Sequence, residues 1–316
     1  MMIWNLYVKL RLSGRKILFN QNILVSVVLP VFNAQEYLRE AIQSILDQTF
    51  TNFEFIIIDD GSMDNSLLII KEFMKIDKRI ILISRENKGI VYTLNEGISI
   101  AKAKYIARMD ADDISIPNRL EKQIELMENR SLDVCGCHYF VMDEQMNLNG
   151  LNLTPLSHEI CVISLAFKVP FAHPSVMIKK EFLMRHGLLY GQSEYKIAED
   201  FDLWLRMYEK GAKFGNVNDV LFKYRVLETS LSKIKHKGII KDTKKMVDIF
   251  FNNHKAGLVT YLETLSDKLN DEEKSLIVRL VFKLLVKNFN VSSLKYLKNI
   301  NKKIIVCSIL SEIING

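Results

Sequence analysis

Between residues 25 and 109 short apolar runs alternate with amphipathic segments, and this alternation constrains the fold more than any other feature of the chain. Residues 25 to 29, VSVVL, form an apolar run followed by Pro30, which predicts a short buried strand ended by that proline. The next segment, NAQEYLREAIQSILDQ, repeats apolar residues at helical spacing, and we expect Asn33 to cap this helix. Two more strand–helix pairs and a final strand follow, with the sequences FEFIIID, NSLLIIKEFMK, RIILIS, GIVYTLNEGISIAK and KYIARMD. The pattern predicts an α/β fold with a Rossmann-like, mostly parallel sheet flanked by helices.

Polar, turn-forming clusters follow the four predicted strands. They read PVFN, DDGSMDN, RENKG and DADD in chain order. Because the carboxyl ends of parallel strands meet at one edge of a sheet, and ligands bind beyond that edge, we expect these clusters to form one site.

The stretch ARMDADDISIP places Asp110, Asp112 and Asp113 within four positions, a crowding that costs repulsion unless a positive group lies nearby. Carboxylates at a strand end suit a hard divalent cation, Mn²⁺ or Mg²⁺, which takes one or two of them together with phosphate oxygens and water. We assign Asp112 to such a cation and interpret Asp113 as the cap of the helix that begins near Pro117. The sequence has no Gly-x4-Gly-Lys-Ser/Thr loop, which excludes a P-loop ATPase.

Two further acidic pairs each leave two interpretations open. Asp60, which follows Asp59 and precedes Gly61, either accepts the imide N–H of a nucleotide base or forms an Asx turn. Glu199 and Asp200 open the predicted helix EDFDLWLRMYEKG, where they either stabilise its N-terminus or include a general base for an acceptor hydroxyl.

The residues between 135 and 195 offer little pattern. His173 either positions a substrate or is structural, and Trp204 either forms a sugar-stacking platform or belongs to the core, which its helical spacing favours. A helix at NRLEKQIELMEN and strands at LDVCGCHYFVMD and AKFGNV are predicted, whereas residues 144 to 170 are expected to be irregular.

Residues 233 to 316 differ from the rest of the chain. They have helical apolar spacing throughout and contain 16 Lys and Arg against 8 Asp and Glu, although the net charge of the whole chain is only +6. Such a basic amphipathic tail can bind acidic membrane lipid or nucleic acid, or form a solvated helical surface; we expect no nucleic-acid partner and keep a peripheral membrane contact open. Its apolar stretches are shorter than the ~20 residues of a spanning helix. With only four cysteines and no secretory signal, we expect a cytoplasmic protein, peripheral at most on the inner face of the cell membrane.

Five sequence blocks, taken together, resemble the inverting glycosyltransferase family 2, with the GT-A fold. The blocks, which lie between residues 24 and 232, are VSVVLPVFNAQEYLREAIQSILDQTFTNFEFIIIDDGSMDNS, ENKGIVYTLNEGISIAKAKYIARMDADDISIPNRLEKQ, HPSVMIKKEFL, AEDFDLWLRM and KYRVLETSLS. The resemblance implies three parts: an extension at 1–23, a GT-A domain at 24–232 and a basic helical region at 233–316. It implies a hexosyltransferase that transfers a sugar from a nucleotide-sugar donor of the UDP-sugar class. The implied acceptor is a glycan or a lipid-linked molecule in bacterial surface polysaccharide or lipooligosaccharide synthesis.

The resemblance also assigns roles residue by residue. Asp200 matches the catalytic base, with Glu199 beside it, and Asp110 and Asp112 match the Asp-x-Asp motif that holds Mn²⁺ or Mg²⁺ on the diphosphate. The positions that would contact the nucleotide sugar are Pro30, Phe32, Asp60, Arg85, Asn87, Arg108, Asp110 and Ala111. Two positions depart from the family pattern: Phe32 replaces the usual Tyr, and Leu227 stands where relatives often have His.

Two rival functions remain at this stage. A nucleotidyltransferase also combines an α/β sheet with acidic metal sites, but it would need a Gly-rich, basic phosphate loop after the first strand, where this chain has LPVFNAQEY. A catalytically inactive polysaccharide-assembly subunit would have kept the fold without needing Asp112 and Asp200.

Overall fold

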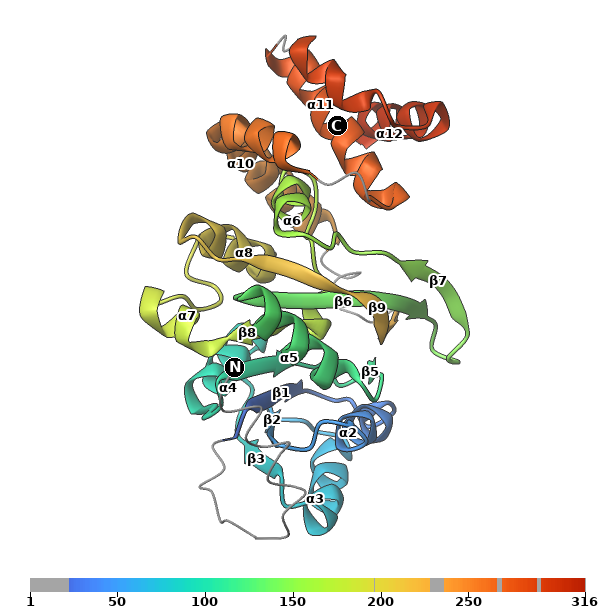
Figure 1. The fold of residues 1–316 in the computed structure, drawn as a ribbon. Helices are drawn as coiled ribbons and strands as arrows, with labels where there is room; N and C mark the ends of the chain where they lie inside the picture. Colours follow the sequence, from blue (N-terminus) through green and yellow to red (C-terminus); the bar gives the residue numbers. More distant parts are fainter. Residues whose placement is uncertain (1–22, 196, 228–235, 266–268, 289–290, 316) are drawn as a thin grey trace, which may run out of the picture.

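The computed structural model describes residues 23–195, 197–227, 236–265, 269–288 and 291–315 (Figure 1). The extension expected at 1–23 lies almost wholly outside these residues, as does the expected boundary near 232. The described part contains one nine-stranded sheet in the order β3-β2-β1-β4-β8-β6-β9-β5, with β7 paired to β6.

The first four strands and the helices between them follow the predicted alternation. They are β1 (Val25–Val31), α2 (Leu38–Leu46), β2 (Phe53–Asp59), α3 (Ser66–Ile76), β3 (Ile80–Ser84), α4 (Ile90–Ile100) and β4 (Tyr105–Arg108). Strands β3, β2, β1 and β4 pair in parallel, as predicted. Their carboxyl ends therefore lie at one edge of the sheet.

The rest of the sheet is more mixed than predicted. It consists of β5 (Ile114–Ser115), β6 (Val134–Met142), β7 (Leu148–Asn152), β8 (Met177–Lys179) and β9 (Phe214–Arg225). Strand β8 pairs antiparallel with β4, and β6 pairs antiparallel with β8. Strand β9 runs parallel to β6. Strand β5 pairs antiparallel with β9, and β7 pairs antiparallel with β6. The fold is α/β as expected, with a mixed sheet.

Two local predictions near the first strand are wrong. Pro30 lies inside β1 and does not end it, because its ring nitrogen faces the side of β4, which has already ended at Arg108 and needs no donor there. Asn33 does not cap α2, which begins at Leu38. Its side chain accepts from the backbone N–H of Met63 at 2.8 Å and so joins the loops after β1 and β2.

Helices cover both faces of the sheet. Alternate residues of β1 face opposite sides: Val27 and Leu29 pack with α2, α3 and α5 (Arg119–Arg130), whereas Val28 packs with α4. The second face also carries α6 (His158–Leu165), α7 (Lys180–His186) and α8 (Glu199–Glu209). Both faces of the strands are therefore buried, as in doubly wound folds.

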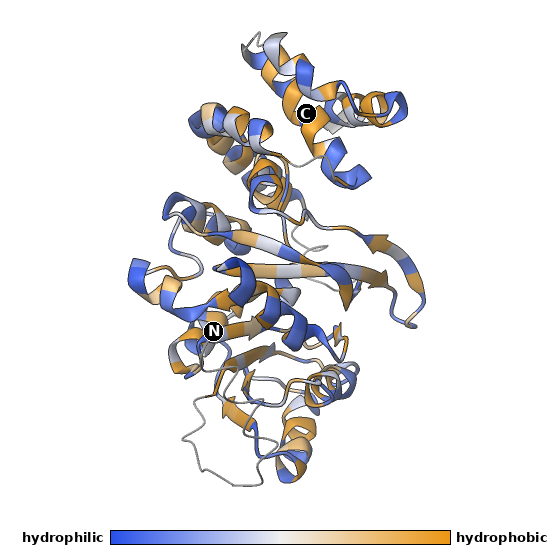
Figure 2. Cartoon of the chain, viewed as in Figure 1, coloured by the Kyte–Doolittle hydropathy of each residue, from blue (hydrophilic) through white to orange (hydrophobic). Residues whose placement is uncertain are grey.

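The C-terminal region is helical, as predicted, and consists of α10 (His236–Thr264), α11 (Asp271–Asn288), the 3₁₀ segment Val291–Leu297 and α12 (Lys302–Asn315). Helix α6, in a segment predicted to be irregular, contacts β9 on one side and α10 and α11 on the other. Residues 160 to 165 of α6 and the following Ala166 are fully buried, and the helix lies between the sheet and the C-terminal helices (Figures 1 and 2). In the described part of the chain, no helix combines the length and the hydropathy that crossing a membrane would require.

Candidate active site

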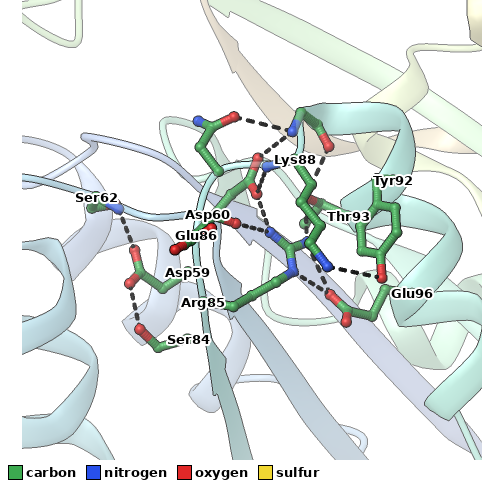
Figure 3. A network of polar contacts seen from close by, with 12 residues as sticks. Asp59, Asp60, Ser62, Ser84, Arg85, Glu86, Lys88, Tyr92, Thr93 and Glu96 are labelled. Atoms are coloured by element: carbon green, nitrogen blue, oxygen red, sulfur yellow. Dashed lines mark hydrogen bonds and ion pairs between the residues drawn. The ribbon is translucent and has the colours of Figure 1, made fainter.

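The edge formed by the carboxyl ends of β2 and β3 contains a network around Asp60 (Figure 3). Asp60 is buried, and its Oδ1 accepts from the Arg85 guanidinium and from the Lys88 backbone N–H at 2.8 Å. Its Oδ2 accepts from the Gly89 N–H at 2.9 Å. Since a carboxylate offers about four lone-pair positions, these donors leave room on Oδ2 for one further N–H.

Arg85 is held on its other side by helix α4. Its Nε donates to Glu96 and its Nη2 donates to Thr93, both at 2.9 Å, and its guanidinium lies 4.9 Å from the centroid of the Tyr92 ring. Lys88 contacts the same ring, with its ammonium 4.6 Å from the centroid. The loop after β3 is thus fixed against Asp60 by buried and half-buried charge pairs.

Asp59, not Asp60, supports the turn after β2. Its Oδ1 accepts from the Ser62 N–H at 3.2 Å and its Oδ2 accepts from the Ser84 hydroxyl at 2.9 Å. Gly61 adopts a φ of +77°, and a Cβ at this position would lie 2.7 Å from the Asn87 nitrogen. A glycine is therefore required for the two loops to approach each other.

The other positions assigned to the nucleotide differ in exposure. Phe32 is 49 % exposed after the end of β1, whereas Pro30 is buried within that strand. Asn87 is exposed, and its side chain accepts from the Gly89 N–H at 3.1 Å.

The acidic turn after β4 brings the three predicted carboxylates together. One carboxylate oxygen from each of Asp110, Asp112 and Asp113 lies within 4.8 Å of the other two. The buried Ala111 separates the first two. Burial, and then the charge of Asp110, raises the pKa of Asp112 to about 6, and burial with the charge of Asp112 raises the pKa of Asp113 well above its ordinary value.

Three buried arginines surround this turn. Arg108 forms a two-pronged ion pair with Asp110, at 2.7 and 2.8 Å. Arg225 donates its backbone N–H to Asp113 and its Nε to the carbonyl oxygen of Asp112, both at 2.7 Å. Arg119 is fully buried, and its charge acts on Asp113. The protein thus supplies part of the positive charge that the sequence predicts.

Asp113 does not cap the following helix. The carboxylate accepts from Arg225, and α5 begins at Arg119 after Asn118. The cap prediction is wrong because the pairing of β5 with β9 turns this carboxylate toward the end of β9.

The acidic turn fits a divalent cation. Its donors are hard carboxylate oxygens at a spacing that allows shared ligation, and the buried Oδ2 of Asp113 has no hydrogen-bond partner among the described residues. Burial is the largest cause of the raised pKa of Asp112; the charge of Asp110 adds to it, and the charges of Arg108 and Arg225 oppose it. Asp110 and Asp112 are the partly exposed members and are the accessible ligands.

The acidic pair Glu199 and Asp200 opens α8, as predicted, and lies near this turn. Burial raises the pKa of Asp200, and the charge of Arg108 opposes this shift. Tyr190 connects the two groups, because the charges of Asp200, Glu199 and Asp110 all act on its buried hydroxyl. The candidate base and the Asp-x-Asp motif therefore lie around one shared pair, Arg108 and Tyr190.

The two candidate acceptor residues have different environments. His173 forms a 3.0 Å hydrogen bond from its Nε2 to the Tyr190 hydroxyl, and burial followed by the charge of Arg108 keeps its pKa well below the ordinary value, so the ring is neutral. Trp204 is 0 % exposed and packs edge-on against Phe171. A sugar cannot stack on a ring that is enclosed in the core, so Trp204 belongs to the core, the interpretation that its helical spacing favours, and is not an acceptor contact.

Sequence reasoning missed Tyr190, Arg119 and Arg225. Tyr190 has no surrounding motif, and although Arg119 and Arg225 lie within two of the quoted sequence blocks, no local pattern marks them as site residues. Each reaches the site through pairings made by distant strands or helices. Thr93 and Glu96 lie at helical spacing on α4 and face Arg85, but nothing local distinguishes them from an ordinary exposed stripe.

Solved structures with the same fold define the class. The structure of residues 1–349 of TarS from S. aureus in complex with UDP-GlcNAc matches 92% of this chain and 89% of its own, with a TM-score of 0.55 and 14% identity. Mannosyltransferase PcManGT from Pyrobaculum calidifontis, in complex with GDP-Man and Mn²⁺, matches 98% and 94%, with a TM-score of 0.56 and 12% identity. The fold is that of the GT-A glycosyltransferases.

Sequence comparison gives the family. Residues 26–187 match the model described as glycosyl transferase family 2. Glycosyltransferase MJ1057 of Methanocaldococcus jannaschii is 38% identical over 220 residues, which are 67% of this chain and 74% of that protein. The E. coli protein WfaP, named as a UDP-Glc:α-D-GlcNAc-diphosphoundecaprenol β-1,3-glucosyltransferase, is 28% identical over 78% of this chain and 99% of its own. The chain belongs to glycosyltransferase family 2 and is a glycosyltransferase.

Proposed function

We propose that the protein is an inverting glycosyltransferase that moves a sugar from a nucleotide diphosphate sugar, a UDP-sugar by preference, to a hydroxyl of a glycan or lipid-linked acceptor. The observation that carries this proposal is the placement of the acidic turn and of Asp200 around Arg108 and Tyr190. The relatives named for O-antigen, teichuronic acid and lipid-diphosphate acceptors support a role in surface polysaccharide or lipooligosaccharide synthesis.

The network around Asp60 is proposed to bind the nucleotide. Its free position on Oδ2 would accept the imide N–H of uracil, while Arg85 and Asn87 border the base and its ribose. The Asp60 N–H donates to the carbonyl oxygen of Val31 at 2.7 Å, and the exposed ring of Phe32, the next residue, provides an apolar surface at this edge. Because Arg85, Lys88 and Gly89 already hold Asp60, the base would enter a preorganised site.

Asp110 and Asp112 would hold Mn²⁺ or Mg²⁺. When bound, such a cation neutralises the negative charge that develops on the leaving diphosphate. Arg108 keeps Asp110 oriented and its buried guanidinium adds positive charge on the donor side of the site.

Asp200 is proposed to accept the proton of the acceptor hydroxyl as that oxygen attacks the anomeric carbon. Its raised pKa makes it a stronger base than an ordinary aspartate. Attack from the face opposite the leaving group in a single step inverts the anomeric configuration. The charges of Glu199 and Asp200 act on Tyr190, which, with neutral His173, would border the acceptor.

The rival functions are less well supported. The loop after β1, residues 32 to 37, contains no glycine and no Lys or Arg to hold a triphosphate as a nucleotidyltransferase would. An inactive assembly subunit would have no need for crowded carboxylates with a raised pKa beside a partly buried candidate base.

A donor panel tests the proposal. Hydrolysis of UDP-, GDP- and dTDP-sugars by the full chain would be measured with Mn²⁺ and with EDTA. We expect turnover of one nucleotide class that EDTA, Asp112→Asn and Asp200→Asn each reduce by at least ~100-fold. Asp219→Asn, which removes an exposed partner of Lys122, serves as the control and should leave turnover unchanged. Tight donor binding without turnover would support the inactive subunit instead.

The protein is proposed to be cytoplasmic, with peripheral contact between its helical region and the inner face of the membrane. On α12, Lys302 and Lys303 are exposed beside Val306 and Leu310, which are 56 % and 52 % exposed. Co-sedimentation with vesicles that contain anionic lipid should fall for Lys302→Glu/Lys303→Glu and not for Lys71→Glu on α3. Equal sedimentation of both variants, or none by the unaltered protein, would refute the contact.

A further inference from the structure

Arg225, the last residue of β9, is enclosed at the meeting point of four segments. Its side chain is 1 % exposed, and its Nη2 donates to Glu40 on α2 at 2.7 Å. Its Nη1 donates to the carbonyl oxygen of Glu144, in the β6–β7 turn, at 3.1 Å. The guanidinium also lies 4.4 Å from the centroid of the Tyr37 ring.

Arg225 also contacts the acidic turn at two points, the main chain of Asp112 and the side chain of Asp113. Its Nε binds the Asp112 carbonyl oxygen, and its backbone N–H binds the Asp113 carboxylate. Arg108 fixes Asp110 on the other side. The main chain around Asp112 is therefore anchored to β9, although no contact of Arg225 uses the Asp112 carboxylate itself.

We propose that Arg225 is a positioning residue that presents the Asp112 carboxylate to the divalent cation. The inference rests on the cation site of the proposed function. Three carboxylates within 4.8 Å repel one another, so an unanchored turn would relax to move them apart. Anchoring the main chain keeps them at ligation distance and lowers the cost of ordering when the cation binds.

The geometry requires arginine at this position. Three separate nitrogens of the rigid guanidinium reach three different segments, and a lysine ammonium on its flexible stem would not reach all of them at once. Arg225→Lys therefore keeps the charge and the backbone N–H bond to Asp113, but it removes the Nε contact with the Asp112 carbonyl oxygen and the links to Glu40 and Glu144.

Arg79 provides a matched control. It likewise donates to a backbone carbonyl, that of Leu46 at 3.1 Å, pairs with Asp77 at 2.7 Å, and lies 4.3 Å from the Phe53 ring centroid. However, it directly precedes β3 and so lies at the edge of the parallel strands away from the site. Arg79→Lys should affect stability alone.

The test measures binding of Mn²⁺ alone to the full-length protein, by the electron paramagnetic resonance of free Mn²⁺, alongside thermal unfolding in EDTA. We expect Arg225→Lys to raise the Kd for Mn²⁺ by about 10- to 100-fold, and Arg79→Lys to change it by less than about twofold. A folded Arg225→Lys protein with an unchanged Kd would overturn the role, as would an equal loss of affinity in Arg79→Lys.

If Arg225→Lys does not fold, Glu40→Gln decides the question. Glu40 is half-exposed and holds the far side of the guanidinium, so its replacement loosens Arg225 without opening the core. A Kd at least threefold higher supports the role, and an unchanged Kd overturns it. Failure of the unaltered protein to bind Mn²⁺ would overturn the cation site and this role together. Equal Mn²⁺ affinity of the unaltered protein and the tested variant would overturn only the role of Arg225.

Discussion

Replacing Asp112 with Asn should stabilise the metal-free protein and abolish transfer. The carboxylate oxygens of the acidic turn lie within 4.8 Å of one another, and two unit charges at this distance repel by about 3.5 kcal/mol at an effective dielectric constant of 20. Burial of Asp112 contributes more to the cost of its charge than the repulsion from Asp110 does, and the charges of Arg108 and Arg225 partly offset both. The rise of its pKa to about 6 corresponds to a similar cost of about 3 kcal/mol.

The sign of this effect depends on pH. A carboxyl group whose pKa is raised by folding destabilises the native state above that raised pKa and not below its ordinary value. Asp112→Asn should therefore raise the unfolding temperature in EDTA by roughly 5 °C at pH 8 and leave it unchanged near pH 3.5. Differential scanning calorimetry on both proteins, with transfer activity measured in Mn²⁺, checks both effects. A lower unfolding temperature for Asp112→Asn at pH 8 would refute the reasoning, because it would mean that protein groups already stabilise this charge.

Three further predictions concern the base, the nucleotide site and the helical region. The raised pKa of Asp200 predicts that kcat/KM falls as the pH is lowered, with a midpoint above the ordinary aspartate pKa of ~4. Excess Mn²⁺ should not shift this midpoint, and a midpoint that changes with the Mn²⁺ concentration would contradict the assignment of the base. Asp60→Asn should weaken UDP binding by at least ~10-fold in calorimetry, since it also releases Arg85 and the 88–89 amides, and equal affinity would exclude Asp60 from the nucleotide site. A chain ending at residue 232 should unfold or aggregate, as judged by circular dichroism and gel filtration, because it uncovers α6; a folded monomer would disprove this packing.

The first half of the fold could be predicted from sequence because its strands and helices are local and strongly periodic. Residues 25 to 108 form parallel strands whose order follows from short right-handed connections. The second half could not be predicted in this way. Strand β8 has three residues and β5 has two, and both exist only because β4, β6 and β9 pair with them.

The site residues likewise separate into those that could be predicted from the sequence and those that could not. Asp60, Asp110 and Asp112 follow predictable strands and could be found as polar clusters at one sheet edge. Arg225 and Tyr190 lie more than 75 residues beyond them and reach the same place through β9 and the segment after α7. The helical spacing of Trp204 favours the core, and its complete burial confirms this interpretation.

The packing of α6 limits how the C-terminal helices of this protein could be exchanged for those of another enzyme. Because one side packs on the catalytic sheet and the other on α10 and α11, the helical region has no core of its own that is separate from the transferase. The Lys283 ammonium donates to the Ala166 carbonyl at the end of α6, and Glu273 accepts from the Leu156 N–H before it. A chimera that replaced the helices from residue 236 onward with those of another enzyme would also need that enzyme's counterpart of α6. The unit to exchange therefore includes residues 156 to 166 as well as the C-terminal helices.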